Sequence, residues 1–463
     1  MINLSTMIKK YEDVIIVANH AMLQQIIKIN SSFGLKKISY KTFTEVISDL
    51  IGEYDNEARI VLQKQANITP ELAAIILKNA LVVNDCYQNK KIRNLLEIKN
   101  EYHKYLRENP LGSNIYRNRT VIIINDYQTN DLFNLALEKL KLISRVIDYQ
   151  SSQKYDKPLN VFCCNSPKQE INNLVKEVSI LLEQGIKPEK IRISAPSDYI
   201  IYLQEVFKLT NLDIVVDKPS LYEYETSKLC LEILEAYLDQ PIQSGFQNAL
   251  EILNAKTSSK NMIIPKIINI FNSYVHYHFK IKDIYQDIKY RFKKTFPTLV
   301  TYQNVLKIQP LLDEVILEDD YLFILGLNQD VFPKTYKDDR YLLDHEREKL
   351  GLVTSKLFNK QEKLKALHLI NRSKNVYLSY SEYTSIGKTP ISSFIQDLKE
   401  HYSVNIVNHQ NDYLISYSEK LDQLQLGKKL DLYYKYDVKS EELFTLYNEY
   451  KHVSYRKYSH KFN

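Results

Sequence analysis

The chain has 463 residues, and this length favours two to four domains over a single core. Hydrophobic residues make up 44% and charged residues 25% of the chain, which excludes a disordered protein. Lysine and arginine number 62 against 56 acidic residues, and the resulting net charge of +6 permits nucleic acid as a partner without requiring it.

The first 150 residues alternate between strand and helix patterns. The run "DVIIV" predicts a buried strand over Val14 to Val17 that leads into an amphipathic helix, and a strand near Ile38 precedes a helix from about Phe43. A third strand is expected at Val121 to Ile124, before another helix, and a fourth in "SRVIDYQ". Such alternation predicts a parallel sheet with helices on both faces.

The polar segment "QSSQKYDKP", at residues 150 to 158, separates this series from a second one. "LNVFCC" predicts a strand, and the helix after it has Ser166 as its N-cap, Pro167 in its first turn and Gly185 at its end. Further strands are expected in "IRIS", "LDIVVD", "YLFILGL" and "NVYLSYSE", with helices between them. The second series therefore predicts another α/β domain.

Two long stretches have apolar residues at helical spacing without clear strands between them. They lie near residues 57 to 115 and residues 222 to 300. We therefore predict two α/β domains, each interrupted by a helical insertion.

The four cysteines are Cys86, Cys163, Cys164 and Cys230, and their spacing forms neither a C-x-x-C pair nor a zinc pattern. We therefore expect these cysteines to be reduced thiols in a cytosolic protein. The N-terminus lacks the apolar core of a signal peptide, and the apolar runs fall short of the ~20 residues needed to cross a bilayer. These features favour a cytoplasmic protein.

Four segments, "YLFILGLNQDVFP", "LLDHEREKLGL", "LKALHLINRSKNVYLSYS" and "TPISSFIQDL", follow one another in that order. Together they resemble the C-terminal motor-like domain of superfamily 1 helicases, and more closely the AddB/RexB subunit of bacterial helicase–nuclease complexes. "NVFCCNSPKQEINNLVKEVSILLEQG" is similar to the start of that family's second domain, and "VIIINDYQTNDLFNLALEKL" to its degenerate Walker B strand and following helix. The resemblance covers roughly residues 12 to 463, and the order of the motifs carries it.

The resemblance implies an α/β fold with two RecA-like parallel-sheet domains of the superfamily 1 helicase type. The first would span residues 1–150, and its insertion would lie at about 57–115. The second would span residues 155–400, and its insertion would lie at about 222–300. Residues 401–463 resemble the linker segment that precedes the nuclease domain in full-length members of the family.

A working motor of this type needs a phosphate loop, G-x-x-x-x-G-K-[ST], directly after its first strand. In this sequence "VIIVANHAMLQQ" contains neither glycine nor lysine, so we expect no such loop there. The tripeptide from Gly387 to Thr389 matches the end of the motif, but Glu382 stands where its first glycine belongs, which favours an ordinary loop. At the Walker B position, Asp126 is the candidate degenerate nucleotide-binding residue; a helix cap is the alternative.

Full-length members of the family also carry a PD-(D/E)XK nuclease domain, in which cysteines hold an iron–sulfur cluster. The last cysteine of this sequence is Cys230, so the resemblance does not extend to the cluster. We expect no catalytic residues, no metal site and no cofactor in this chain, although ATP, Mg²⁺ and an iron–sulfur cluster belong to the family.

The resemblance implies single-stranded DNA and an AddA/RexA-like motor subunit as partners, and no membrane. In the loop from Gly326 to Lys334, Phe332 is a candidate to stack on a base, which would contribute ~1–3 kcal/mol; packing against its own helix is the alternative. Lys334 is a second DNA-binding candidate. Arg372 and Lys374 occupy the place of a phosphate- or DNA-facing arginine in helicases, and a surface salt bridge is the alternative there.

Three classes of function follow. The first is a DNA-binding, non-catalytic AddB/RexB-like subunit, or a fragment of one, in double-strand-break repair and recombination. The second is a protein–protein scaffold or truncated remnant with no DNA activity of its own. The third is an autonomous ATPase with a non-standard site, which the missing phosphate loop disfavours.

Overall fold

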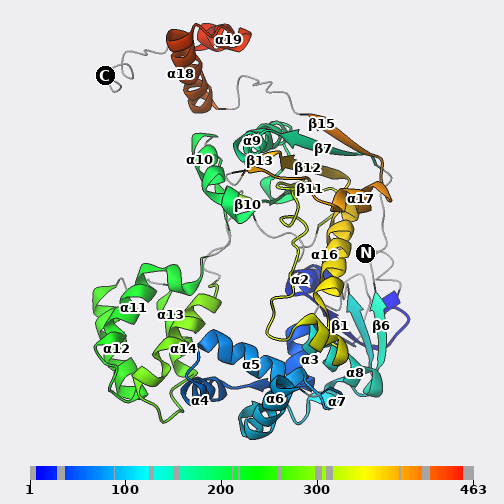
Figure 1. Cartoon of the computed structure of the whole chain (residues 1–463), viewed down its shortest axis with the longest axis vertical. Helices are drawn as coiled ribbons and strands as arrows, with labels where there is room; N and C mark the ends of the chain where they lie inside the picture. Colours follow the sequence, from blue (N-terminus) through cyan, green and yellow to red (C-terminus); the bar gives the residue numbers. More distant parts are fainter. Residues whose placement is uncertain are drawn as a thin grey trace.

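The computed structural model describes residues 7–28, 37–87, 89–124, 130–149, 157–210, 212–216, 219–257, 262–297, 305–308, 316–384, 387–408 and 418–451. The fold is α/β and contains a four-stranded and a seven-stranded sheet, both parallel, as the strand–helix alternation predicts (Figure 1). The smaller sheet uses strands from residues 13 to 149, and the larger uses strands from residues 159 to 408.

The four-stranded sheet has the order β2-β1-β5-β6. Its strands are β1 (Asp13–Ala18), β2 (Lys37–Thr42), β5 (Thr120–Ile124) and β6 (Arg145–Tyr149), and its helices are α2 (His20–Lys28), α3 (Phe43–Leu50) and α8 (Asp131–Ile143). Side chains alternate between the two faces of a strand. In β1, Ile15 and Val17 pack beneath α3 and α8, whereas Val14 and Ile16 pack beneath α2. Helices on both faces therefore explain why the strand is apolar throughout.

The first insertion is mostly helical and lies between β2 and β5. It contains α4 (Asn56–Ala66), α5 (Pro70–Val82), α6 (Lys90–Glu101), a short 3₁₀ turn (His103–Tyr105), α7 (Gly112–Tyr116) and the two-residue strands β3 (Glu53–Tyr54) and β4 (Leu106–Arg107). Asp55, Thr69 and Asn89 cap α4, α5 and α6 by accepting a hydrogen bond from a first-turn amide. Sequence analysis missed β3 and β4 because two residues establish no periodicity.

The seven-stranded sheet has the order β15-β7-β12-β11-β8-β10-β9. Its strands are β7 (Leu159–Cys164), β8 (Ile191–Ser194), β9 (Ile214–Val215), β10 (Leu306–Ile308), β11 (Tyr321–Ile324), β12 (Asn375–Ser381) and β15 (Val404–Asn408). β15 lies beyond residue 400, where the second domain was expected to end, yet it pairs with β7 in this sheet. Its five residues offer too short a pattern to distinguish a strand from a linker.

Helices cover both faces of this sheet as well. α9 (Pro167–Glu183) and α10 (Ile200–Thr210) cover one face, and α16 (Ser355–Arg372) and α17 (Phe394–Lys399) cover the other. The predicted limits of α9 are confirmed: Ser166 accepts a hydrogen bond from the amide of Gln169, and Gly185 follows the helix with a φ of 81°. Consecutive residues of β11 divide between the faces, with Phe323 beneath α9 and α10 and Ile324 beneath α16 and α17.

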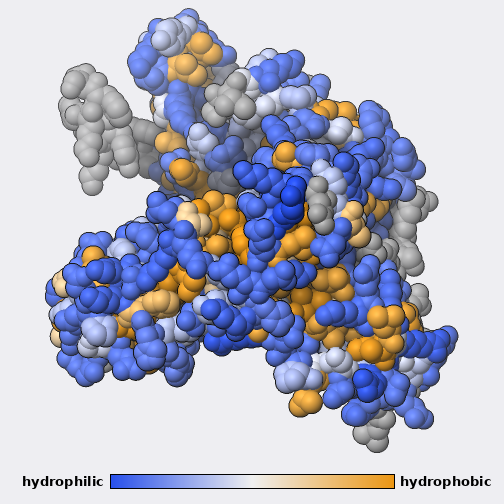
Figure 2. All heavy atoms as spheres, turned by 60° about the horizontal axis from the view of Figure 1, so that its bottom comes forward, coloured by the Kyte–Doolittle hydropathy of each residue, from blue (hydrophilic) through white to orange (hydrophobic). Residues whose placement is uncertain are grey.

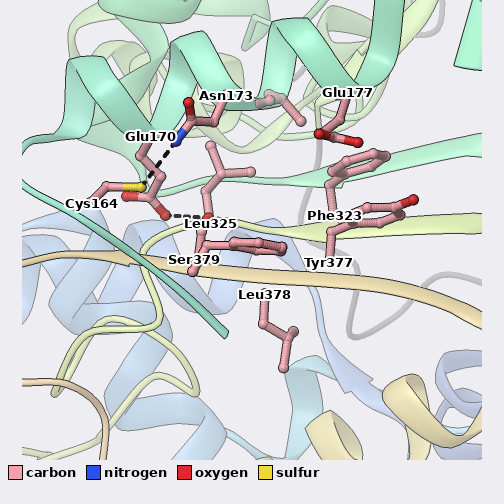
Figure 3. A pocket seen from close by; sticks show the side chains of 11 residues that line it. Cys164, Glu170, Asn173, Glu177, Phe323, Leu325, Tyr377, Leu378 and Ser379 are labelled. Atoms are coloured by element: carbon pink, nitrogen blue, oxygen red, sulfur yellow. Dashed lines mark hydrogen bonds between the residues drawn. The ribbon is translucent and has the colours of Figure 1, made fainter. Parts of the chain in front are cut away.

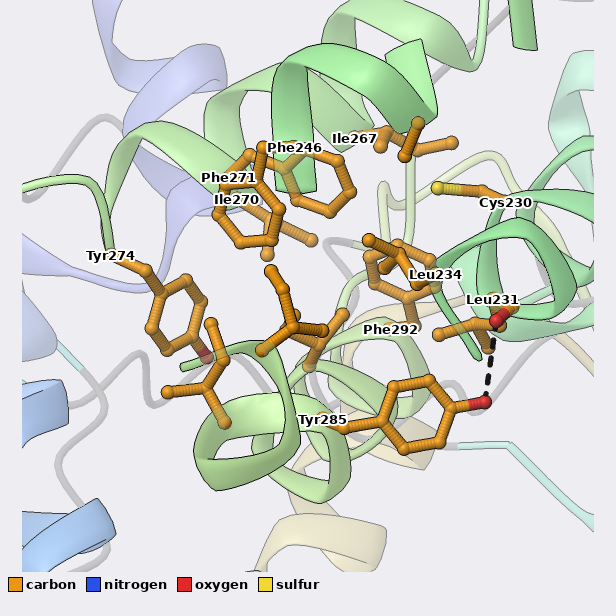
Figure 4. Close-up of a cluster of buried hydrophobic side chains, with 14 of the residues drawn as sticks. Cys230, Leu231, Leu234, Phe246, Ile267, Ile270, Phe271, Tyr274, Tyr285 and Phe292 are labelled. Atoms are coloured by element: carbon orange, nitrogen blue, oxygen red, sulfur yellow. Dashed lines mark hydrogen bonds between the residues drawn. The ribbon is translucent and has the colours of Figure 1, made fainter. Parts of the chain in front are cut away.

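The second insertion packs around its own apolar core, shown in Figure 4. It contains a 3₁₀ turn (Leu221–Glu223), α11 (Glu225–Glu235), α12 (Ile242–Lys256), α13 (Ile264–Asn272) and α14 (Ile281–Lys294). Phe246 and Phe271 stack at its centre, with ring centroids 3.9 Å apart and an angle of 10° between the planes. Ile60 of α4 also lies in this core, so the first insertion completes the packing of the second.

A buried carboxylate joins the two insertions. Asp287 of α14 is fully buried and accepts hydrogen bonds from both Nε and Nη2 of Arg59 on α4. It also accepts one from the hydroxyl of Tyr274, at 2.5 Å. One helical turn away, Lys64 and Asp283 form a second, partly exposed ion pair at 2.9 Å.

A second connection joins the segment after β11 to the first sheet. Arg347 of α15 (Asp344–Lys349) is 4% exposed and pairs with Asp131, the first residue of α8. Glu346 accepts hydrogen bonds from Asn89 at 2.7 Å and from Lys91 at 3.1 Å. Parts of the chain that are more than 200 residues apart in sequence are therefore fastened together at two places.

The last two described helices, α18 (Glu419–Tyr436) and α19 (Glu441–Tyr450), form a hairpin whose own buried core is small. Large apolar side chains are exposed on it, including Tyr434 at 79% and Tyr436 at 71%. The face of the molecule in Figure 2 is mostly hydrophilic, with hydrophobic side chains gathered towards its centre. Within the described residues, every helix is too short or too polar to span a lipid bilayer.

Candidate nucleic-acid interface

Three neighbouring strands of the larger sheet end side by side. β8 ends at Ser194, β11 at Ile324 and β12 at Ser381, and the three are adjacent and parallel. Ligands of open parallel sheets bind outside the carboxyl ends of the strands. The chain leaves the sheet at this edge through a loop from Gly326 to Lys337, which includes the segment from Gly326 to Lys334 that the sequence indicated.

Glu170, in the first turn of α9, lies directly beneath the start of this loop. Its side chain is 1% exposed, and its carboxylate accepts hydrogen bonds from the Gly326 amide at 2.7 Å, the Ser379 hydroxyl at 2.6 Å and the Tyr199 hydroxyl at 2.8 Å. Glu170 and Ser379 line a cavity of about 30 Å³. Figure 3 shows the side chains around it. Burial raises the pKa of Glu170, although the hydrogen bonds from its three donors oppose the shift.

Gly326 is the residue at which the strand breaks into the loop. Its φ is 69°, in the left-handed region that side chains disfavour, and a β-carbon at this position would clash with the ring of Pro196. The backbone can therefore turn here only because residue 326 is glycine.

Asn328 holds the next part of the loop against the end of β12. Its side chain is 2% exposed; Nδ2 donates to the carbonyl of Ser381 at 2.8 Å. The main chain of the preceding residue also makes two hydrogen bonds. The Leu327 amide donates to the Ser379 carbonyl at 2.8 Å, and the Leu327 carbonyl accepts from the Ser392 amide at 3.0 Å. The loop is thus fixed to the sheet as far as residue 328.

The position of Phe332 corrects the expectation that its ring stacks on a base. Phe332 is 8% exposed and belongs to the core beneath α16 and α17, where its ring meets Phe394 edge to face at 6.5 Å between centroids. Its neighbour Val331 is 42% exposed, so the loop turns the valine outward and the phenylalanine inward. Phe332 therefore packs inside the protein, as the alternative prediction stated, and its ring contacts Phe394 of α17.

Lys334 is exposed, and its ammonium lies 5.3 Å from the centroid of the Tyr336 ring. Tyr336 is fastened to α16: its amide donates to Asn359 Oδ1 at 2.8 Å, its carbonyl accepts from Asn359 Nδ2 at 3.0 Å, and its ring packs edge to face on Phe358. The loop therefore lies along the first turns of α16.

Four exposed lysines lie on this loop and on the first turns of α16: Lys334, Lys337, Lys356 and Lys360. Lys356 and Lys360 are four residues apart and so lie on the same side of the helix. Among the residues that the structure describes, none of the four lysines has an ion-pair partner. We define these lysines, together with Tyr336, as the basic loop surface. Lysines beside an aromatic ring suit the charged backbone and stacked bases of a single strand.

Arg372 and Lys374 lie elsewhere. Lys374 precedes β12, at the opposite end of the strand from the loop, and forms an ion pair with Glu318 in which both side chains are about half exposed. Arg372 ends α16, about 20 Å along the helix from Asn359. Lys374 therefore forms a surface salt bridge, which was the alternative to a DNA contact. Neither Lys374 nor Arg372 belongs to the basic loop surface.

Asp126 lies outside the described residues. At the corresponding edge of the smaller sheet, a single residue, Asn19, connects β1 to α2, and its side chain caps the helix by accepting from the Met22 amide at 2.8 Å. A phosphate loop needs about eight residues at this place, so this turn does not form one. Gly387 and Lys388 form the two-residue strand β14, which pairs antiparallel with β13 (Tyr383–Thr384), so this tripeptide begins in a short strand and not in the plain loop that was expected.

Neither Glu170 nor Asn328 was predicted from the sequence as a functional residue. A signal for Glu170 was present, because it shares the buried side of α9 with Ile171 and Leu174, where an apolar residue is expected. Asn328 had no such signal, since a polar residue in a loop is ordinary.

The sequence matches no family model and no curated protein. Within the described parts of the chain, His, Cys, Asp and Glu side chains form no group of three or more that could hold a metal ion.

Proposed function

We propose that this chain is a DNA-binding, non-catalytic subunit of the AddB/RexB type, with two RecA-like domains, in a helicase–nuclease complex that acts in double-strand-break repair and recombination. Single-stranded DNA and an AddA/RexA-like motor subunit are its partners. The order of the sequence motifs supports the family, and two parallel sheets in one chain are compatible with it.

The observation that carries the DNA-binding part is the basic loop surface. A loop fixed at the carboxyl edge of the larger sheet by Gly326 and Asn328 carries the exposed Lys334 and Lys337 to the first turns of α16, which bear the exposed Lys356 and Lys360. A loop whose backbone is already held loses little conformational freedom on binding, and its lysines suit a phosphate backbone as ligand. Base stacking by Phe332 is not part of the proposal.

The proposal is tested by the binding of a single-stranded oligonucleotide at several salt concentrations. Replacing Lys334, Lys337, Lys356 and Lys360 by alanine should weaken binding and reduce the slope of log affinity against log salt by up to about 3, because each phosphate contact contributes roughly 0.7. A control variant removes four other exposed lysines: Lys187, Lys190, Lys208 and Lys256. Equal slopes in the two variants would refute the proposed interface.

The connections between distant parts of the chain favour a second candidate, a protein–protein scaffold. Arg59–Asp287 and Arg347–Asp131 fasten the insertions and sheets together, and rigidity of this kind suits a platform for partners. A scaffold without a DNA role would copurify with a motor subunit but show no salt-dependent DNA binding.

A further inference from the structure

Glu170 is a buried acid that the proposed DNA contacts do not use. It gathers donors from three elements: the Gly326 amide from the loop, Ser379 from β12, and Tyr199 from the 3₁₀ turn before α10. Tyr199 is itself 2% exposed and shares a further hydrogen bond of 2.9 Å with the Ser381 hydroxyl. The network spans the α9 face, the sheet and the start of the loop.

Burying a carboxyl group in this space costs solvation free energy. No lysine or arginine among the described residues donates to Glu170, and the nearby Asp198 carries the same charge. An apolar side chain would avoid the loss of solvation that a buried carboxyl group suffers. The gain from Glu170 therefore lies in directed hydrogen bonds, which an apolar residue cannot make.

The direction that matters most is that of the Gly326 amide. Along this stretch the Leu325 amide donates to Ser194 of β8 at 2.9 Å, and the Leu327 amide donates to Ser379 of β12 at 2.8 Å. Between them, the Gly326 amide points out of the sheet and donates to Glu170. The carboxylate thus sets the point at which the backbone leaves the sheet and enters the loop.

We propose that Glu170 is a positioning residue for the basic loop surface, acting through Gly326 to hold the loop that carries Lys334 and Tyr336. The inference rests on the function proposed above. Glu170 touches no ligand and adds no charge to the surface. Its role is to hold the backbone of the loop that carries Lys334 and Lys337, so that less conformational entropy is lost when these lysines bind a ligand.

The pattern of donors predicts which substitutions work. Oε1 accepts from both Gly326 and Ser379, whereas Oε2 meets only the Tyr199 hydroxyl. In Glu170→Gln the amide oxygen can keep the first two bonds, and the amide nitrogen can donate to the Tyr199 oxygen while that hydroxyl donates to Ser381. Glu170→Ala loses all three bonds, and Glu170→Asp is one carbon too short to reach them.

The experiment compares single-stranded DNA affinity in Glu170→Gln, Glu170→Asp and Glu170→Ala. We expect affinity within about twofold of wild type for Gln, and a loss of about tenfold for Ala and Asp, the equivalent of one unsatisfied buried donor. Leu174→Ala is the matched control, because Leu174 lies one turn further along α9, is 4% exposed and packs in the same core but makes no hydrogen bond to the loop through its apolar side chain. If Leu174→Ala weakens binding as much as Glu170→Ala, or if Gln fails to rescue, the inference is overturned.

Hydrogen exchange over residues 326–337 separates this inference from the proposed function. Faster exchange there in Glu170→Ala, but not in Glu170→Gln or Leu174→Ala, supports the positioning role even if wild-type protein binds no DNA. Such a result would refute the proposed DNA binding but not the positioning role of Glu170. Unchanged exchange in Glu170→Ala would overturn the positioning role whatever the DNA result.

Discussion

Replacing Asp287 by asparagine is the sharpest test of how the two helical insertions are held together. The side chain of Asp287 is fully buried, and that of Arg59 is 12% exposed. Burial alone would lower the pKa of Arg59, but the hydrogen bonds and charge of Asp287 outweigh it and raise the pKa. The substitution removes the negative charge and leaves the guanidinium buried without its counter-ion.

The expected cost is large because solvent cannot take the place of the lost partner. Removing one member of a buried pair costs about 3–5 kcal/mol, compared with about 0–1 kcal/mol for an exposed pair. The second pair on the same two helices, Lys64 and Asp283, has side chains 43% and 22% exposed and provides the internal control. Lys64→Ala should therefore cost about 1 kcal/mol or less.

The assay is urea unfolding followed by far-ultraviolet circular dichroism, since the chain has no tryptophan. Hydrogen exchange of α4 and α14 shows where stability is lost. We expect both helices to lose protection together in Asp287→Asn, because Ile60 of α4 completes the core of the second insertion. Equal losses of stability in Asp287→Asn and Lys64→Ala would refute this reasoning.

Three further predictions follow from the structure. Burial raises the pKa of Glu170 above that of an exposed glutamate, so wild-type protein should lose stability as the pH rises from the ordinary glutamate range towards the folded pKa. Glu170→Gln lacks this loss, so its unfolding free energy relative to wild type should increase as the pH rises above about 4; a constant difference in urea titrations would contradict the shift. Gly326→Ala should cost at least about 2 kcal/mol in the same assay, because the left-handed backbone and the contact with Pro196 both oppose a β-carbon; a stable variant would show that the loop can rearrange. Arg347→Met should cost about 3 kcal/mol or more and raise hydrogen exchange at the start of α8, since Asp131 loses its buried partner; unchanged exchange there would show that this ion pair does not join the two parts.

Much of the secondary structure could be predicted because its signals are local. The apolar run at Val14 to Val17 and the cap at Ser166 depend only on neighbouring residues, and both lie in the expected elements. The short strands β3, β4 and β15 could not be predicted, because they exist through pairing with distant partners. The same limit applied to the candidate site: sequence order suggested Lys334, which the structure places on an exposed loop, but it could not show that Phe332 turns inward.

The sequence by itself determined the alternation of strands and helices and the two ends of α9, at Ser166 and Gly185. These properties follow from periodicity and from the backbone preferences of single residues. Only the tertiary structure decided that Glu170 lies beneath the loop, that Lys334 lies beside α16, and that Arg372 lies far from both. The physical reason is that burial and hydrogen-bond partners depend on which distant segments meet, and no local pattern carries that information.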